Sequence, residues 1–159
     1  SVSTNKKWSQ FQEKEYNFLF WTVDGYTLER IVFFKPLEDG RSLFDHDSLF
    51  SKENEKRPVF NSKMNKFEMK EFFEDCILWT REFANFETAN IKNYKIDDVE
   101  GISFDIKAQN ELGLNYKGFA IVGTKNKKFY SVYFIATEME FYDKYREEAK
   151  KIISSIKIL

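Results

Sequence analysis

Hydrophobic and polar positions alternate most clearly in the second half of the chain. Between Ile102 and Ala108 every second residue is apolar, which is the period of a half-buried β-strand. Strand-like composition predicts further strands over residues 18–23, 26–34, 86–94, 114–124 and 128–136. The last of these is apolar at odd and even positions alike, which predicts a strand covered on both faces of its sheet.

Two stretches instead repeat their apolar residues at spacings of three and four, as amphipathic helices do. The first covers residues 65–83, where Asn65 and Glu68 have the spacing of a capping box. The second covers residues 137–155, where Thr137 and Glu140 repeat that spacing. Asp24-Gly25 between the first two strands predicts a tight hairpin.

Consecutive strands joined by short turns imply an antiparallel meander, on which two helices must bury their apolar faces. We therefore predict an α+β fold, an antiparallel sheet of about five to seven strands with helices packed on it. Residues 1–15 are interpreted as a polar lead-in segment or a short helix, and residues 16–159 as a single domain. Residues 35–64 show no period and predict a long loop, in which Leu43, Phe44, Leu49 and Phe50 pack down on the body.

Composition narrows the classes of function. The chain has 159 residues and a net charge of −1, so it lacks the basic excess of a nucleic-acid-binding protein. No apolar run approaches the length of a membrane span. The first residue is Ser1 rather than Met, which suggests a processed N-terminus that a signal peptide once preceded. Aromatic residues make up 18% of the chain, and this excess must fill either a core or a binding surface.

Catalytic patterns are missing from the sequence. His46 is the only histidine, and Asp45, His46 and Asp47 are too few neighbouring ligands to predict a metal site. Cys76 lies on the apolar face of the first helix, which predicts a buried thiol rather than a nucleophile. The glycines do not have the spacing of a phosphate-binding loop. We expect no enzyme activity, no cofactor and no metal.

The aromatic residues of the predicted strands allow two interpretations. They can fill the interface between sheet and helices, or they can form a platform for a ligand. The residues concerned are Trp21, Tyr26, Phe33, Phe34, Tyr116, Phe119, Tyr130 and Tyr133.

Several short stretches resemble a group of proteobacterial envelope lipoproteins. They are residues 21–28 (WTVDGYTL), 35–43 (KPLEDGRSL), 58–60 (PVF), 99–105 (VEGISFD) and 113–118 (GLNYKG). The resemblance implies a domain of the bacterial cell envelope that faces the periplasm, with a signal and a lipid-modified cysteine ahead of it. The order of strands and helices is also similar to that of PsbP and of Mog-type Ran-binding proteins, which implies an α/β/α sandwich. No catalytic residues come with the resemblance.

These observations give two hypotheses of function. The first is a non-enzymatic envelope protein that binds a protein partner or supports an assembly through the loop at residues 35–64. Its candidate binding residues are Asp39, Gly40, Arg41, Asp45 and His46, although Asp39 and Gly40 could simply form a turn. The second is a carrier of a small molecule or lipid, with an aromatic-lined pocket between sheet and helix. An enzyme would instead need polar side chains converging in a cleft.

Overall fold

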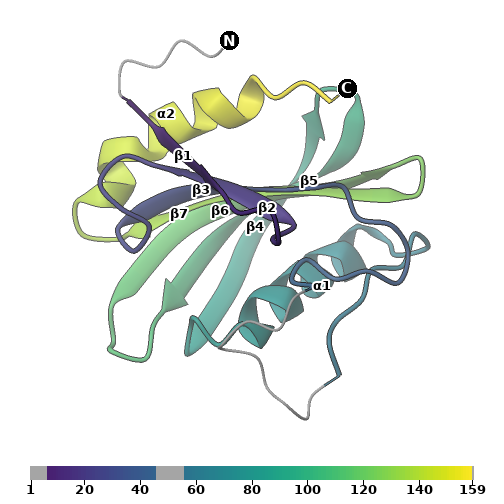
Figure 1. The fold of residues 1–159 in the computed structure, drawn as a ribbon, viewed down its shortest axis with the longest axis horizontal. Helices are drawn as coiled ribbons and strands as arrows, with labels where there is room; N and C mark the ends of the chain where they lie inside the picture. The colour runs from purple at the N-terminus through teal and green to yellow at the C-terminus, as the bar shows by residue number, and fades with distance from the viewer. Residues whose placement is uncertain (1–6, 46–55, 159) are drawn as a thin grey trace.

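The computed structural model describes residues 7–45 and 56–158, and its centre is an antiparallel sheet of seven strands (Figure 1). The strands lie side by side in the order β1-β2-β3-β7-β6-β5-β4. Their bounds are β1 Ser9–Gln12, β2 Phe18–Thr22, β3 Glu29–Phe34, β4 Asn85–Ile96, β5 Val99–Gln109, β6 Asn115–Lys125 and β7 Lys128–Thr137. The helices are α1, Lys66–Trp79, and α2, Phe141–Ser154. The predicted α+β class and antiparallel sheet are confirmed.

In the middle of the sheet, a strand from the first part of the chain pairs with the last strand. Strand β3 pairs with β7, so that Ile31 lies opposite Phe134 and Phe33 opposite Val132. In the sequence, α1 and strands β4 to β6 all lie between these two partners. Neither helix in the described ranges combines the length and the hydrophobicity that crossing a membrane requires.

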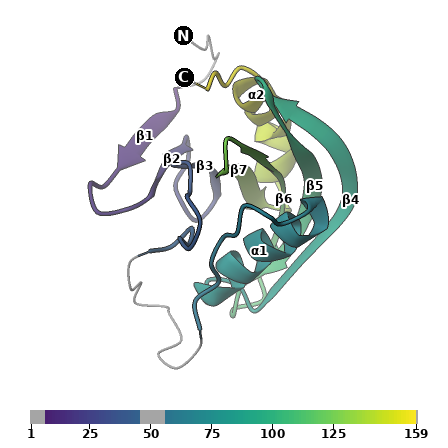
Figure 2. The same cartoon turned by 90° about the vertical axis from the view of Figure 1, so that its right-hand side faces the viewer.

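The two helices pack on opposite faces of the sheet (Figure 2). Strand β7 serves both faces, because successive side chains of a strand alternate between them. Tyr133 and Ile135 belong to the buried cluster around α1, whereas Val132 and Phe134 belong to the cluster around α2. The prediction that residues 128–136 are covered on both faces is therefore confirmed.

Helix α1 begins where its capping box predicts. The Asn65 side chain accepts a hydrogen bond from the Glu68 N–H at 2.9 Å, and the Glu68 carboxylate accepts one from the Asn65 N–H at 2.8 Å. These bonds satisfy N–H groups that no helical carbonyl reaches. The helix ends at Trp79 rather than at residue 83, because Thr80 caps it and Arg81 adopts a φ of 59°.

Helix α2 begins later than the sequence predicts. Thr137 pairs with Tyr116 of β6, and its N–H donates to the Leu28 carbonyl at 2.9 Å, so this residue still belongs to β7. The chain then turns at Glu140, whose φ is 100° and whose side chain makes no capping hydrogen bond. The second predicted capping box is wrong, because strand pairing holds Thr137 away from the first turn of the helix.

The connection between β2 and β3 is wider than a tight hairpin. It is organised by the buried carboxylate of Glu29, which accepts hydrogen bonds from Thr22 Oγ1 at 2.7 Å and from the Asp24 N–H at 3.0 Å. Gly25 adopts a φ of 136°, a conformation that side-chain-bearing residues rarely reach. The Glu29 side chain, at the start of β3, thus accepts the hydrogen bonds that hold this connection in place.

Part of the lead-in segment is a strand and not a short helix. Strand β1 pairs with β2, with Phe11 opposite Phe20, and forms one edge of the sheet. All its residues are exposed, so the alternation that marks a half-buried strand is missing from its sequence. The sheet therefore begins before residue 16.

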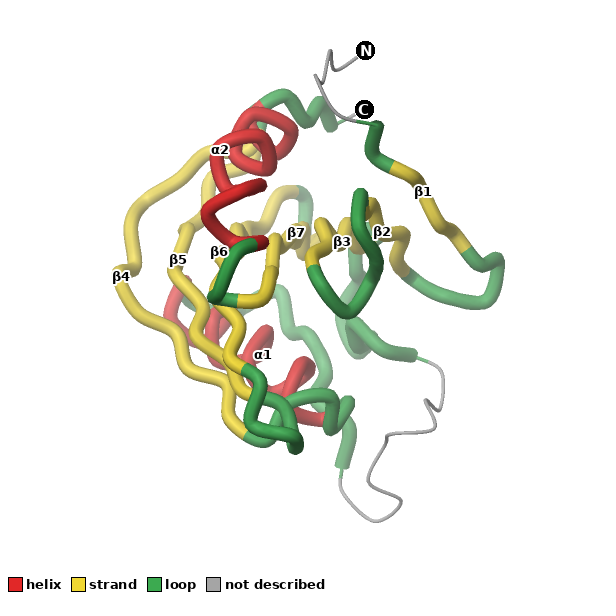
Figure 3. Tube along the Cα trace, turned by 90° about the vertical axis from the view of Figure 1, so that its left-hand side faces the viewer, coloured by secondary structure: helices red, strands yellow, loops and turns green. Residues whose placement is uncertain are grey.

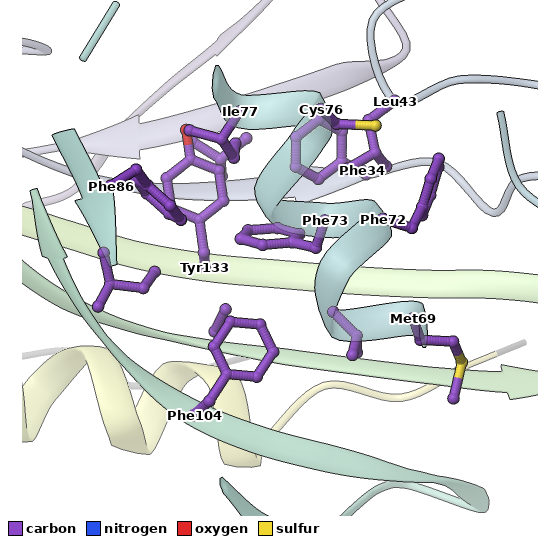
Figure 4. Packing of buried hydrophobic residues seen from close by; sticks show 14 of the residues in the cluster. Phe34, Leu43, Met69, Phe72, Phe73, Cys76, Ile77, Phe86, Phe104 and Tyr133 are labelled. Atoms are coloured by element: carbon purple, nitrogen blue, oxygen red, sulfur yellow. The ribbon is translucent and has the colours of Figure 1, made fainter. Parts of the chain in front are cut away.

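A single helix is too narrow to cover one face of this sheet. Strands lie about 4.8 Å apart, so seven of them span roughly 29 Å, whereas a helix with its side chains is about 10 Å wide. Helix α1 lies over β4 to β7, where the Phe73 ring meets Phe104 at 5.6 Å and Tyr133 at 5.7 Å between centroids (Figure 4). The α1 face of β1 to β3 is left to other parts of the chain.

The described residues of the segment 35–64, which are 35–45 and 56–64, cover part of that remaining face. Leu43 is fully buried, and the Phe44 ring packs edge-on against Phe34 with centroids 5.5 Å apart. The predicted packing of Leu43 and Phe44 is confirmed, and Leu49 and Phe50 lie outside the described residues. What the described residues of this segment and α1 leave uncovered is a groove.

Candidate functional site

A groove of about 850 Å³ lies on the α1 face of the sheet, beside the helix rather than under it. Strands β1 to β3 form one wall, and the other includes residues 43–45 and 80–82. Most of its apolar lining is aromatic, from Phe11, Tyr16, Phe18, Phe20, Tyr26, Phe44 and Tyr133. We call this hollow the aromatic groove.

The rings of the aromatic groove contact one another across strands. Phe11 stacks on Phe20 with centroids 5.1 Å apart, and Phe20 meets Tyr26 edge-on at 4.8 Å. Tyr16 stacks on Phe18 at 5.3 Å. Phe11 lies directly opposite Phe20 in the β1–β2 pair, and such opposite residues share a face of the sheet. Strand register therefore builds this wall of rings.

A buried cation lies behind the rings. Arg30 is 1% exposed, and it donates from Nη2 to Glu82 Oε1 at 2.6 Å and from Nη1 to the Tyr26 carbonyl at 3.1 Å. Its guanidinium carbon also lies 4.1 Å from the centre of the Tyr26 ring. These contacts tie β3 to the chain that leaves α1, and they fix Glu82 and Tyr26 in the groove lining.

The environment keeps the Arg30 guanidinium charged and the Tyr26 hydroxyl neutral. Burial alone would lower the pKa of Arg30, but the adjacent Tyr133, Glu82 and Tyr26 raise that pKa above its ordinary value. Burial also raises the pKa of Tyr26, so its hydroxyl stays protonated at neutral pH. The aromatic groove therefore offers neutral rings, with a paired rather than a free cation behind them.

Polar side chains line the aromatic groove beside the β5–β6 turn, as others do elsewhere along it. Arg81, Glu82, Asn110 and Glu111 contribute to the lining there, together with the exposed Leu112. The neighbouring turns are held in place by hydrogen bonds, such as the one that Tyr116 Oη donates to the Thr27 carbonyl at 2.9 Å. A molecule with an apolar body and a polar head would find partners for both.

Two other hollows, of about 500 and 430 Å³, lie between α1 and residues 56–64. The α1 side of the larger one is acidic, with Glu71 and Asp75 among its lining residues. Burial, together with the charges of Glu74 and Glu71, raises the pKa of Asp75. Sites for small molecules are mostly apolar with a few polar groups, so the aromatic groove is the stronger candidate.

Three of the predicted binding residues lie outside the lining of the aromatic groove and hold the segment 35–64 together. Asp39 accepts hydrogen bonds from the N–H and the hydroxyl of Ser62, and the N–H bond in particular lowers the pKa of Asp39. Gly40 adopts a φ of 79° and donates its N–H to the Phe60 carbonyl at 2.8 Å. Arg41 pairs with Asp45, with 2.7 Å between Nη2 and Oδ2. These contacts indicate a turn-forming role.

Asp45 is the one predicted binding residue that the described part of the chain places in the groove lining. Its second oxygen accepts the Ser42 N–H at 3.1 Å, so its carboxylate is already engaged on both sides. His46, and Asp47 with it, lies outside the described residues. A binding role for Asp39, Gly40, Arg41, Asp45 and His46 stays a prediction.

The aromatic residues of the predicted strands divide between the two interpretations. Tyr26 and Tyr133 line the aromatic groove, whereas residues such as Phe34 and Phe119 lie in the buried clusters. The interface under α1 is filled, so the hollow lies beside the helix and not between helix and sheet. Phe11 and Tyr16 were not predicted, because residues of an exposed edge strand and of a turn carry no period, whereas Phe44 was predicted only to pack on the body.

Cys76, on α1, is fully buried beside Leu43, in agreement with the sequence prediction (Figure 4). Its Sγ lies 3.8 Å from Ser42 Oγ. Burial raises the pKa of the Cys76 thiol to about 12. The thiolate, which is the reactive form, is therefore absent near neutral pH.

We expect the native protein to react with a thiol reagent at pH 8 at least about a hundredfold more slowly than the unfolded chain. Ellman's reagent with and without guanidinium measures this ratio. Between pH 9 and 12 an unfolded Cys76 is ionised and a folded one is not, so stability falls as pH rises through this window. Fast stoichiometric labelling of the native protein would contradict the buried placement, and Cys76→Ala should remove this part of the pH dependence.

Among residues 7–45 and 56–158, no three His, Cys, Asp or Glu side chains are grouped so that they could hold a metal ion. No protein-family model matches the chain, and no curated protein matches it. The aromatic groove is therefore the feature from which a function can be argued.

Proposed function

We propose that this protein is a non-enzymatic binding domain that carries an elongated apolar molecule, such as a lipid chain, in the aromatic groove. The observation that carries the proposal is a hollow of about 850 Å³ whose apolar lining is mostly aromatic. Ligand sites usually fall between about 300 and 1,000 Å³ and combine apolar walls with a few polar groups. The groove meets both conditions.

The ring lining favours an apolar ligand over a polar one. Exposed aromatic surface gains most from burying apolar surface of a partner. The side chains of Phe11, Tyr16 and Tyr26 are between 37% and 50% exposed, so an occupant would bury ring surface that water now covers. Arg81 and Asn110 in the lining can orient a head group.

We further propose that the domain works in the bacterial cell envelope, on the periplasmic side and anchored through a lipidated cysteine of its precursor. This placement is supported by the resemblance of residues 21–28 and 35–43 to envelope lipoproteins. The helix on each face of the sheet is compatible with a PsbP-like α/β/α sandwich, which we propose as the finer fold. A protein partner stays a prediction, and a pull-down with the precursor from envelope extract tests it.

Phe11→Asp should weaken binding of the neutral fluorescent probe phenylnaphthylamine by about tenfold, because it removes ring surface and adds a charge to the groove. Phe11 is half exposed, so the fold should tolerate the change. Titration of the probe, followed by its fluorescence, gives the dissociation constant.

Phe67→Asp is the matched control, because Phe67 is 64% exposed on α1 and does not line the groove. This variant should bind the probe as the unmodified protein does. Equal affinities for all three proteins, or no binding at all, would refute a carrier role for the aromatic groove. Extraction and mass spectrometry of the protein purified from its host would identify a natural occupant.

A further inference from the structure

Two large apolar side chains are almost completely exposed at the tips of turns. Leu112, in the β5–β6 turn, is 94% exposed, and Met139, between β7 and α2, is 87% exposed. Neither side chain has a packing role at such exposure. Exposed apolar side chains that cluster together mark interaction sites.

Both turns lie at the same end of the sheet, because the start of β6 pairs with the end of β7 (Figure 3). The Glu138 N–H donates to the Asn115 carbonyl at 2.9 Å, which places the Met139 turn against the start of β6. Tyr116 Oη donates to the Thr27 carbonyl at 2.9 Å, which adds the β2–β3 turn. Leu114, which is 45% exposed, lies between Leu112 and Met139 in the sequence. We call this end of the sheet the turn end.

The turn end is continuous with the aromatic groove. Ten large hydrophobic side chains are exposed on the described residues, and four of them line the groove, Phe11, Tyr16, Tyr26 and Leu112. Leu114, which directly precedes β6, and Met139, between β7 and α2, add exposed apolar side chains at the same end of the sheet. Four of the ten exposed apolar side chains thus share one hollow, and Leu112 connects this hollow to the turn end.

We propose that the turn end docks reversibly on lipid bilayers whose head groups carry no net charge, and that this contact loads and unloads the aromatic groove. The proposal rests on the carrier function. Leu112, Leu114 and Met139 would insert among the head groups and upper acyl chains, as apolar residues of peripheral proteins do. The open groove would then face the interface.

Charge decides which lipid surface is favoured. Glu111 and Glu140 flank the exposed tips and Arg81 lies in the adjoining groove lining, while Glu138 pairs with Lys117, with 3.0 Å between Oε1 and Nζ. Acidic side chains are repelled by anionic head groups at low salt. Separate protruding tips also suit a fluid interface better than a protein partner, which would need matching hollows.

Flotation with phosphatidylcholine vesicles tests the docking. The unmodified protein should float with these vesicles, and less with vesicles that contain phosphatidylglycerol. The double variant L114S/M139S should bind phosphatidylcholine vesicles about tenfold more weakly. F67S removes an equally apolar exposed residue from the far end of α1 and should bind as the unmodified protein does.

Phenylnaphthylamine titration separates the two proposals, because Leu114 and Met139 do not line the groove. Loss of flotation with retained probe binding in L114S/M139S supports docking through the turn end. An unmodified protein that binds the probe but no vesicle, prefers anionic vesicles, or buries the turn end in a dimer overturns docking alone. Failure to bind the probe overturns the carrier function on which docking rests.

Discussion

Replacing Phe73 with alanine is expected to lower the free energy of unfolding by about 4 kcal/mol. Phe73 is fully buried, and its ring contacts Phe86, Phe104 and Tyr133 under α1 (Figure 4). Its removal leaves a cavity lined by residues of three strands, which a rigid sheet cannot collapse to fill. Urea unfolding measures the loss.

Phe67→Ala on the same helix is the matched control, because that ring is mostly exposed, and it should cost no more than about 0.5 kcal/mol. Phe73→Leu keeps much of the volume and should cost about 1.5 kcal/mol. Similar losses for Phe73→Ala and Phe67→Ala would mean that α1 does not pack on the sheet through this face.

Glu82→Ala should cost about 3 kcal/mol, because it leaves the buried guanidinium of Arg30 without its carboxylate. Arg30 is 1% exposed, whereas the Glu82 side chain is 34% exposed, so water can replace only part of the lost interaction. Thermal or urea unfolding gives the change. The exposed Glu87→Ala on β4 should change stability by less than about 0.5 kcal/mol.

The double variant R30M/E82A separates the cost of an unpaired charge from the cost of lost packing. Replacing both members of a buried pair by apolar groups is often close to neutral. R30M/E82A should therefore be more stable than E82A alone. If the second substitution instead adds to the loss, Arg30 contributes mainly through its contact with the Tyr26 ring.

Local signals predicted those elements whose cause is itself local. The Asn65–Glu68 capping box set the start of α1, and the alternation from Ile102 to Ala108 identified β5, because both depend on neighbours in the chain. Thr137 carried the same capping signal and yet lies in β7, because pairing with Tyr116 outweighed it. Strand β1 had no alternation to detect, since both of its faces are exposed.

The aromatic groove depends on relations that no local pattern contains. It exists because α1 covers β4 to β7 and leaves β1 to β3 open, and this choice follows from the order of strands in the sheet. The sequence did indicate that the aromatic residues would go either to the core or to a binding surface. Strand register decides which aromatic residues line the groove and which lie in the core, as Phe11 opposite Phe20 illustrates.

The pairing of β3 with β7 also governs when the molecule can be completed during synthesis on the ribosome. Strands β1 to β3 are made first, but apart from one another their only neighbour in the sheet is β7, which is made near the end. Until residue 137 has left the exit tunnel, these three strands have no scaffold to join, and their phenylalanines face water or a chaperone. A nascent chain therefore has no groove to fill until β7 has paired with β3.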